Sequence, residues 1–295
     1  MIDNRSNRDI VLVTADILAT ELSSPTPPVL LDVRWALGVT DNRAHYVNGH
    51  LPGARFVDLD AELAAPSSPA LGRHPLPDVA DLQQCARVWG IDDDSKVVVY
   101  DDSSGLAAAR AWWLLRWAGL STVRVLDGGL SAWTASGGRL ETGEPEGVVV
   151  GGVRLDGGHL PVVDADAAAA LAYSGVLLDA RAAERYRGEA EPVDPRAGHI
   201  PGAISAPTTE NLTVDGRFLD DQALTERFTR LRVSTNTEPK TVGVYCGSGV
   251  TAAHQALALA VIGVPATLFA GSWSQWSSDP GRPVAVGSDA AKDRL

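Results

Sequence analysis

The sequence is poor in cysteine, short of basic residues relative to acidic ones, and without a long apolar run. It contains two cysteines among 295 residues, Cys85 and Cys246, which excludes a disulfide framework and a cysteine-rich zinc site. Lysine and arginine number 25 against 37 aspartates and glutamates, so the formal net charge is -12. A charge of this sign argues against a nucleic-acid partner, and local positive groups must attract any anionic substrate.

The N-terminal stretch also lacks the features of a targeting segment. Residues 1–22 carry charges throughout and contain no uninterrupted apolar core, which argues against a secretory signal or a membrane anchor. The small number of cysteines fits a reducing compartment, so we expect a cytoplasmic protein without a membrane partner. A chain of 295 residues predicts two domains, each large enough to bury its own core.

The chain repeats one series of motifs. Each of four motifs occurs twice, in the same order and about 145 residues apart, which indicates an internal duplication. The first copies are VLLDVR (29–34), GHLPGA (49–54), KVVVY (96–100) and VLDGGLSAW (125–133), and the second copies are VLLDAR (176–181), GHIPGA (198–203), TVGVY (241–245) and LFAGSWSQW (268–276).

Both halves alternate short β-branched runs with helical patterns, such as residues 107–119 and 252–263. This alternation predicts an α/β fold in which each half has a parallel sheet covered by helices on both faces. Residues 136–161 are rich in glycine and lack helical periodicity, so the boundary between the halves lies there. We expect a first domain over residues 1–140, a linker over 141–160 and a second domain over 161–295.

The most reactive stretch is residues 242–254 (VGVYCGSGVTAAH), which predicts a strand, a tight loop and the start of a helix. The amides of such a loop point inward, and the N-terminus of the helix adds about half a positive charge. A thiol placed there should ionise easily, so Cys246 is a candidate thiolate nucleophile. Gly247 and Gly249 would let backbone N–H groups approach whatever the sulfur carries. A buried structural cysteine is the alternative.

The two copies differ at this loop. The second copy reads CGSGVTA (246–252), whereas the first reads DDSSGLA (101–107), with Asp101 directly after the strand. The nucleophile therefore has no counterpart in the first half. We expect the second half to carry the chemistry and the first half to act as a scaffold.

Two histidines and the other cysteine are expected to have structural roles, although both residue types often take part in catalysis. His50 and His199 both lie in GHxPGA turns, and because only one copy has the loop cysteine, a histidine present in both copies favours a structural role. Cys85 lies in a helical pattern and is expected to be half-buried.

In its motifs the chain resembles the tandem-domain rhodaneses, the family of thiosulfate and 3-mercaptopyruvate sulfurtransferases. The resemblance covers almost the whole chain. It implies two tandem rhodanese-like domains, each a five-stranded parallel sheet flanked by helices, with an inactive first domain. It also implies that Cys246 carries a persulfide between donor and acceptor, stabilised by the loop amides of Gly247, Gly249, Val250 and Thr251, in a geometry suited to a delocalised anion.

The loop also carries information on the sulfur donor. Family members that prefer thiosulfate have a loop similar to CRKGVT, whereas members that prefer 3-mercaptopyruvate have one similar to CGSGVT, the form found here. In the second group the loop serine joins a histidine and an aspartate of the first domain, which the resemblance maps to Ser248, His74 and Asp60. Such a group could relay a proton to the enolate that leaves. The alternative for His74 is a surface histidine before a proline.

The donor's anionic end requires cations. Arg185 matches the family arginine that binds a carboxylate or sulfonate, which a guanidinium holds through two parallel hydrogen bonds. The second arginine of the family is replaced here by Val193, so either Arg196 takes its place or the donor is different. The resemblance implies no metal or organic cofactor, a small anionic sulfur donor, and cyanide, a small thiol or a thioredoxin-like protein as acceptor.

Two other functions use a similar loop. A Cys-x5-Arg phosphatase needs an arginine six residues after the cysteine, where this chain has Ala252. A non-enzymatic relay that hands persulfide sulfur to a protein partner is compatible with the loop. Turnover of thiosulfate or 3-mercaptopyruvate with cyanide separates a relay from an enzyme.

Overall fold

A computed structural model describes residues 6–145, 147, 149–234 and 241–288. The chain forms two compact units, and each takes a short segment from the other half of the chain. The first unit comprises Met1–Ala65, Leu76–His159 and Val214–Phe218, and the second comprises Pro66–Pro75, Leu160–Thr213 and Leu219–Leu295.

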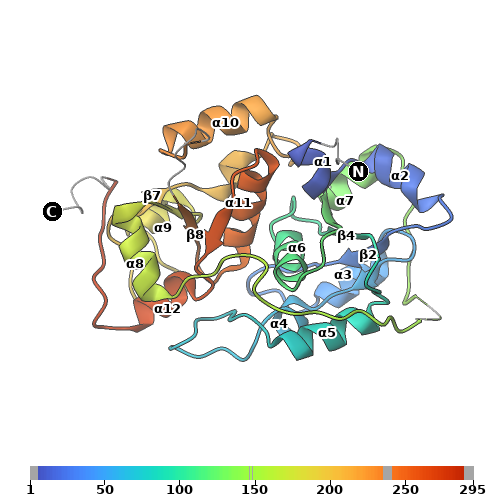
Figure 1. Ribbon diagram of the computed structural model, residues 1–295, viewed down its shortest axis with the longest axis horizontal. Helices are drawn as coiled ribbons and strands as arrows, with labels where there is room; N and C mark the ends of the chain where they lie inside the picture. Colours follow the sequence, from blue (N-terminus) through green and yellow to red (C-terminus); the bar gives the residue numbers. More distant parts are fainter. Residues whose placement is uncertain (1–5, 146, 148, 235–240, 289–295) are drawn as a thin grey trace. The chain divides into compact units, whose positions relative to one another are not determined.

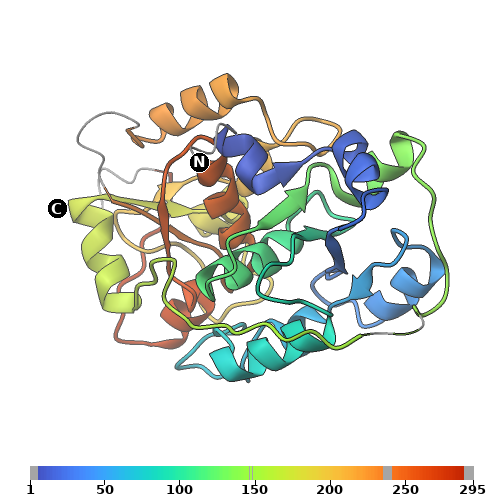
Figure 2. The same cartoon turned by 45° about the vertical axis from the view of Figure 1, so that its right-hand side comes forward.

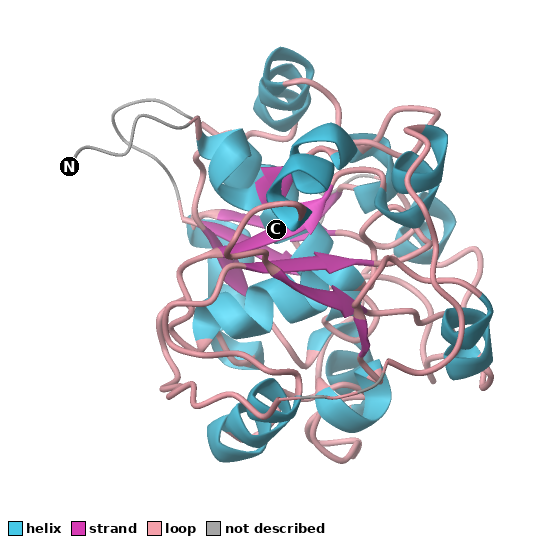
Figure 3. Ribbon diagram, turned by 90° about the vertical axis from the view of Figure 1, so that its right-hand side faces the viewer, coloured by secondary structure: helices cyan, strands magenta, loops and turns pink. Residues whose placement is uncertain are grey.

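The first unit is built on a five-stranded parallel sheet with the strand order β1-β5-β4-β2-β3. Helices lie on both sides of the strands (Figures 2 and 3). Its elements are α1 (Asn7–Val11), β1 (Leu12–Val13), α2 (Ala15–Leu22), β2 (Val29–Asp32), α3 (Asn42–Asn48), β3 (Arg55–Phe56), α4 (Leu59–Glu62), α5 (Val79–Val88), β4 (Val97–Tyr100), α6 (Ala108–Trp117), β5 (Val123–Leu126) and α7 (Gly129–Ala135) (Figure 1).

The second unit has a parallel sheet with the order β7-β6-β8-β9. Its elements are α8 (Ala165–Ser174), β6 (Val176–Asp179), α9 (Ala183–Arg187), β7 (Ile204–Ser205), the 3-10 helix η1 (Thr208–Asn211), α10 (Asp221–Arg230), β8 (Val242–Tyr245), α11 (Val250–Val261), β9 (Ala266–Leu268) and α12 (Ser272–Ser278) (Figure 1).

The α/β architecture with two parallel sheets flanked by helices is thus confirmed. The sequence accounts for it directly, because every residue of β4, β5, β6 and β8 is buried, as in strands covered on both faces. In the part of the chain that the structure describes, the second sheet has four strands. The position of a fifth strand is reduced to a parallel bridge between Val162 and Leu268.

The aspartate–arginine motif ties the end of a strand to the following turn. In the second unit, Arg181 donates to Asp179 from Nε at 3.0 Å and from Nη2 at 2.6 Å, and Nη2 also donates to the carbonyl of Gly198 at 2.7 Å. Arg34 and Asp32 repeat the arrangement in the first unit. Both pairs are buried, so removing one partner would leave a costly unpaired charge.

The histidines of the two turns are buried in equivalent surroundings. Nδ1 of His50 lies 3.0 Å from the carbonyl oxygen of Tyr46, and Nδ1 of His199 lies 2.8 Å from that of Tyr186. Each imidazole also stacks on the ring of the same tyrosine, with centroids 4.0 and 3.6 Å apart. These contacts agree with the structural role expected for both histidines.

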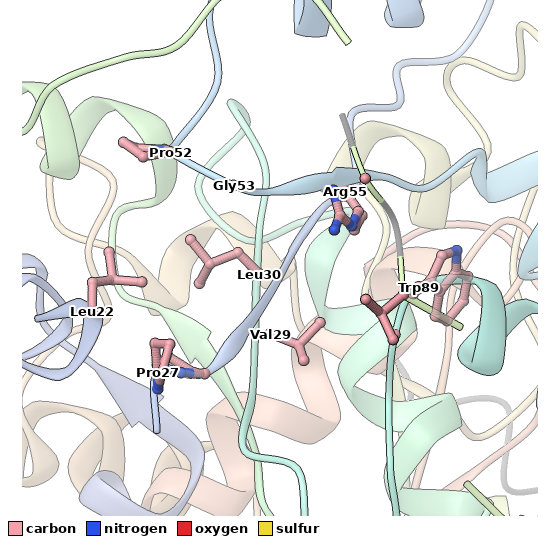
Figure 4. Close-up of a pocket in the computed structure, with 12 residues that line it drawn as sticks. Leu22, Pro27, Val29, Leu30, Pro52, Gly53, Arg55 and Trp89 are labelled. Carbon is pink, nitrogen blue, oxygen red and sulfur yellow. The ribbon is translucent and has the colours of Figure 1, made fainter. Parts of the chain in front are cut away.

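A cavity of about 430 Å³ opens on the first unit beside β2 (Figure 4). Its lining is mostly apolar, with Leu22, Leu30 and Trp89 among the side chains, and Arg55 is the charged group. No cysteine, histidine or carboxylate is among the lining residues that the structure describes. Cys246, Ser248 and His74 lie in the second unit.

None of the helices within the described ranges has the length and apolar character needed to cross a bilayer.

Candidate active site

Cys246 follows β8 directly and precedes the loop that leads into α11 (Figure 1). Its side chain is buried, and the backbone N–H of Gly249 donates to its Sγ at 3.1 Å. The loop ends at the N-terminus of a helix of 12 residues, whose first amides lack partners within the helix. The sulfur therefore lies where amide dipoles favour negative charge.

Gly249 is required by the backbone at this point. It caps α11 with φ of +83°, a left-handed conformation that residues with a side chain rarely adopt. A Cβ atom at this position would also lie 2.5 Å from the carbonyl oxygen of Ala270. The close approach of these two backbone segments fixes the path of the loop around the sulfur.

Backbone hydrogen bonds join the loop of Cys246 to the N-terminus of α12. The amides of Trp273 and Ser274 donate to the carbonyls of Cys246 and Gly247 at 3.0 and 2.8 Å. Ser272 accepts a hydrogen bond from the amide of Cys246 at 3.2 Å on its Oγ, and has φ of +53°. The residues GSWSQW (271–276), from the second copy of the fourth repeated motif, thus support the loop. The sequence did not assign this role to them.

The first unit shows what the equivalent loop can bind. Asp101 follows β4 as Cys246 follows β8, because Tyr100 and Tyr245 pair with the corresponding aspartates of β2 and β6. The Asp101 carboxylate accepts four backbone N–H groups at 2.8 to 2.9 Å. These amides belong to residues 103, 105, 107 and 108. This loop fold is therefore a preformed anion cradle.

Ser248 and His74 are in direct contact. Nδ1 of His74 lies 2.7 Å from Oγ of Ser248, and both side chains are buried. His74 comes from the segment Pro66–Pro75, which belongs to the second unit although it lies in the first half of the sequence. The two groups are close enough to exchange a proton.

Asp60 lies in α4 of the first unit. Both of its carboxylate oxygens accept the indole N–H of Trp35, each at 3.0 Å. Its participation in a relay with His74 and Ser248 stays a prediction.

Arg185, on α9, is surrounded by carboxylates. Its Nε and Nη2 donate to Glu191 at 3.3 and 2.5 Å, and Nη2 also donates to Asp194 at 3.0 Å. Nη1 takes part in none of these bonds. It lies 3.4 Å from the position that a Cβ atom on Gly247 would occupy, so it points at the residue after Cys246.

A second arginine reaches the same place. Arg73 precedes His74, and its Nη1 donates to the carboxylate of Asp194. Its Nη2 lies 3.0 Å from the position of a Cβ atom on Gly247. Nε is buried and has no hydrogen-bond partner among the residues that the structure describes. Two guanidinium groups therefore converge beside the loop of Cys246.

Arg196 is used differently. Its Nε donates to the carbonyl of Ser277 at 2.8 Å, and its Nη1 to that of Arg282 at 2.9 Å. Nη2 donates to the carbonyls of Trp276 and Asp279 at 2.9 and 2.5 Å. These contacts tie the last turn of α12 to the segment that follows it, so the geometry favours a structural role for Arg196 over binding of a donor.

The remaining predicted residues lie at the start of α11. Val250 and Thr251 are its first two residues, so their amides belong to the turn whose N–H groups lack partners within the helix. Val250 is buried and Thr251 is half-buried. This placement is compatible with the anion-binding role expected for the loop.

Sequence reasoning missed Arg73, Glu191 and Asp194. Asp194 is almost fully buried, and burial raises its pKa against the opposing effect of Arg73. Glu191 joins Arg185 to Arg181. The signal available in the sequence was the arginine directly before His74, together with the acidic residues on either side of Val193.

Known proteins match the chain over nearly its whole length. The family model described as "Rhodanese-like domain" matches residues 14–136 and 164–279. A putative thiosulfate sulfurtransferase, SseB of Mycobacterium tuberculosis, is 49% identical over 286 residues, which cover 95% of this chain and 99% of the relative. A probable 3-mercaptopyruvate sulfurtransferase of Pseudomonas aeruginosa is 48% identical over 288 residues, covering 94% and 98%.

A solved structure has the same fold. The crystal structure of SseA from Escherichia coli, one of the 3-mercaptopyruvate sulfotransferases, superposes with a TM-score of 0.77 at 35% identity. The match covers 89% of this chain and 98% of the SseA chain. The likeness thus extends over both halves of the sequence.

Proposed function

The chain belongs to the rhodanese family of sulfurtransferases, and we propose that it moves sulfane sulfur from 3-mercaptopyruvate or thiosulfate, through a persulfide on Cys246, to a thiol or cyanide. One observation carries the proposal. The Sγ atom of Cys246 accepts the amide of Gly249 in a loop whose counterpart directs four backbone N–H groups at the carboxyl oxygens of Asp101. A persulfide anion is stabilised by the same arrangement of amides.

The first step with 3-mercaptopyruvate forms one sulfur–sulfur bond and breaks one carbon–sulfur bond. The thiolate of Cys246 attacks the donor sulfur, and the electron pair of the carbon–sulfur bond passes to the carbon, giving the enolate of pyruvate. The proton of the donor thiol is released, and one proton is delivered to the enolate. With thiosulfate, attack on the outer sulfur expels sulfite and requires no proton at carbon.

Ser248 and His74 supply the proton in the first reaction. The hydroxyl of Ser248 donates to the developing enolate, and the imidazole of His74, 2.7 Å away, restores that proton. Asp60 is proposed as the third member of this group, which would orient the imidazole. The loop serine replaces a cation here, which favours 3-mercaptopyruvate as the donor.

The second step returns Cys246 to its starting state. A nucleophilic acceptor attacks the outer sulfur of the persulfide, a bond forms between the acceptor and that sulfur, and the thiolate of Cys246 leaves. With cyanide the product is thiocyanate, and with a small thiol or a thioredoxin-like protein it is a new persulfide. Cys246 and Cys85 are both free thiols, which fits a reducing compartment such as the cytoplasm.

The test is turnover of each donor with cyanide on one preparation of the protein. Thiocyanate from both donors, and pyruvate from 3-mercaptopyruvate, are expected, with the higher kcat/KM for 3-mercaptopyruvate. A persulfide trapped on Cys246 without turnover of either donor would instead support a sulfur relay to a protein partner.

A further inference from the structure

We propose that Arg73 is the second cation of the donor site, and that Asp194 restricts this site to donors whose bound end carries a single negative charge, such as a 2-oxo acid. The inference rests on the proposed function and names residues that decide the donor. It concerns a segment, Pro66–Pro75, that contributes to the second unit from the first half of the sequence.

The guanidinium groups of Arg73 and Arg185 both reach the backbone of Gly247. Nη2 of Arg73 and Nη1 of Arg185 lie 3.0 and 3.4 Å from the Cβ position of Gly247, the residue that follows the nucleophile. Nη1 of Arg73 and Nη2 of Arg185 each contact one oxygen of Asp194. Each arginine therefore binds Asp194 with one nitrogen and presents another to the loop of Cys246.

Arg73 retains capacity for a ligand. Its Nε has no hydrogen-bond partner in the described part of the chain, although the atom is buried. A buried donor without a partner is costly, and an anion bound between the arginines would satisfy it. Arg196, by contrast, already donates to four backbone carbonyls.

The charges of the cluster are balanced before any donor binds. Its three guanidinium groups are joined by three carboxylates through ion pairs of 2.5 to 3.4 Å and the contact between Arg73 and Asp194. The members are Arg73, Arg181, Arg185, Asp179, Glu191 and Asp194.

A balanced cluster discriminates between donors by their charge. The carboxylate of a 2-oxo acid brings one negative charge to the arginines, whereas thiosulfate brings two. Partly buried charges are screened weakly, so the second charge is disfavoured by the carboxylate of Asp194, whose side chain is 2% exposed. Asp194 thus orients both arginines and at the same time limits the charge that they can accept.

The test compares kcat/KM for 3-mercaptopyruvate and thiosulfate, with cyanide as acceptor, in Arg73→Ala, Arg73→Lys and Asp194→Asn. Arg73→Ala should lower kcat/KM for 3-mercaptopyruvate about 10- to 100-fold, mainly through KM, because one charged hydrogen bond is lost. Arg73→Lys should recover part of the loss. Asp194→Asn should raise the ratio of thiosulfate to 3-mercaptopyruvate activity about 10-fold.

The chain offers a matched control pair. Arg187 lies on the same helix as Arg185 and is ion-paired with Glu189 at the surface. Arg187→Ala and Glu189→Gln remove the same kinds of charge without touching the cluster, so both should leave the two kcat/KM values unchanged.

Binding is measured separately from turnover, by protection of Cys246 against alkylation. Sulfate should protect Asp194→Asn at lower concentration than it protects the unmodified enzyme, and the gain for pyruvate, which carries one charge fewer, should be smaller. If the unmodified enzyme turns over neither donor, the proposed function fails. If it is active but Asp194→Asn leaves both the donor ratio and sulfate protection unchanged, or Arg73→Ala leaves 3-mercaptopyruvate turnover unchanged, the present inference alone is overturned.

Discussion

Asp101 and Cys246 occupy the same position at the ends of two corresponding strands, β4 and β8, and the carboxylate of Asp101 accepts four amides of the loop that follows it. In the first unit a carboxyl group of the chain itself therefore occupies the loop. In the second unit the sulfur of Cys246 occupies that place, and it accepts the amide of Gly249 at 3.1 Å. The same loop fold thus holds a carboxyl group in one copy and, in the proposed function, the reacting sulfur in the other.

Asp101→Ala should destabilise the first unit, because four backbone N–H groups lose their acceptor in a buried site. We expect the free energy of unfolding of the first unit to fall by about 3 kcal/mol, as measured by urea denaturation. Asp102→Ala, at the exposed neighbouring position, is the control and should change little. Equal stability of the two variants would contradict the anion-cradle interpretation.

Cys246→Ser should abolish sulfur transfer from both donors, whereas Cys85→Ser should leave kcat/KM unchanged. Burial raises the pKa of the Cys85 thiol, and nearby Glu62 and Asp81 raise it further, so Cys85 is expected to alkylate slowly at neutral pH. The measurement is thiocyanate formation together with mass spectrometry of the sulfur-loaded protein. Sulfur loading or transfer retained by Cys246→Ser would refute the assignment of the nucleophile.

His74→Ala and Ser248→Ala should lower 3-mercaptopyruvate turnover about 100-fold while affecting thiosulfate turnover much less. The reason is that only the first donor leaves as a carbon anion that needs a proton. Steady-state kcat with each donor checks the prediction, and the thiosulfate reaction serves as the internal control. A loss of the same size with both donors would indicate that the pair of side chains acts through the structure of the loop.

Gly249→Ala should destabilise the second unit by about 3 kcal/mol, since a left-handed residue gains a side chain that meets the carbonyl oxygen of Ala270 at 2.5 Å. Gly287→Ala is the matched control, because Gly287 has φ of +92° and open space around its Cβ position. It should lose about 1–2 kcal/mol, the cost of the backbone conformation alone. Thermal unfolding compares the two, and equal losses would exclude a contribution from the close approach.

Donor choice should depend on pH through Asp194. Burial raises the pKa of this carboxyl, Glu191 acts in the same direction, and Arg73 and Arg185 oppose the shift. As the pH falls toward this raised pKa, protonation removes the negative charge between the arginines, so thiosulfate activity should rise relative to 3-mercaptopyruvate activity. The ratio is measured from neutral to acidic pH, and Asp194→Asn should show a flat profile. A slope retained in that variant would assign the effect to another group.

Much of the fold follows from the sequence because duplicated motifs and alternating strands and helices are local signals. The loop of Cys246 was predictable for the same reason, since its residues are consecutive. The arginine cluster was not predictable, because Arg73 and Asp194 are far apart in the chain and meet only when the segment Pro66–Pro75 packs in the second unit. The shortening of the second sheet was also missed, because residue patterns do not fix where strand pairing ends.

The segment Pro66–Pro75 has a consequence for how such a protein can change over generations. It is encoded in the first repeat, yet it carries His74 into contact with Ser248 of the second. A gene that lost its first repeat would keep Cys246 but would lose His74 and Arg73, which lie in residues 66–75. We therefore expect the two repeats to be retained together in one gene, because the second repeat depends on side chains that the first repeat encodes.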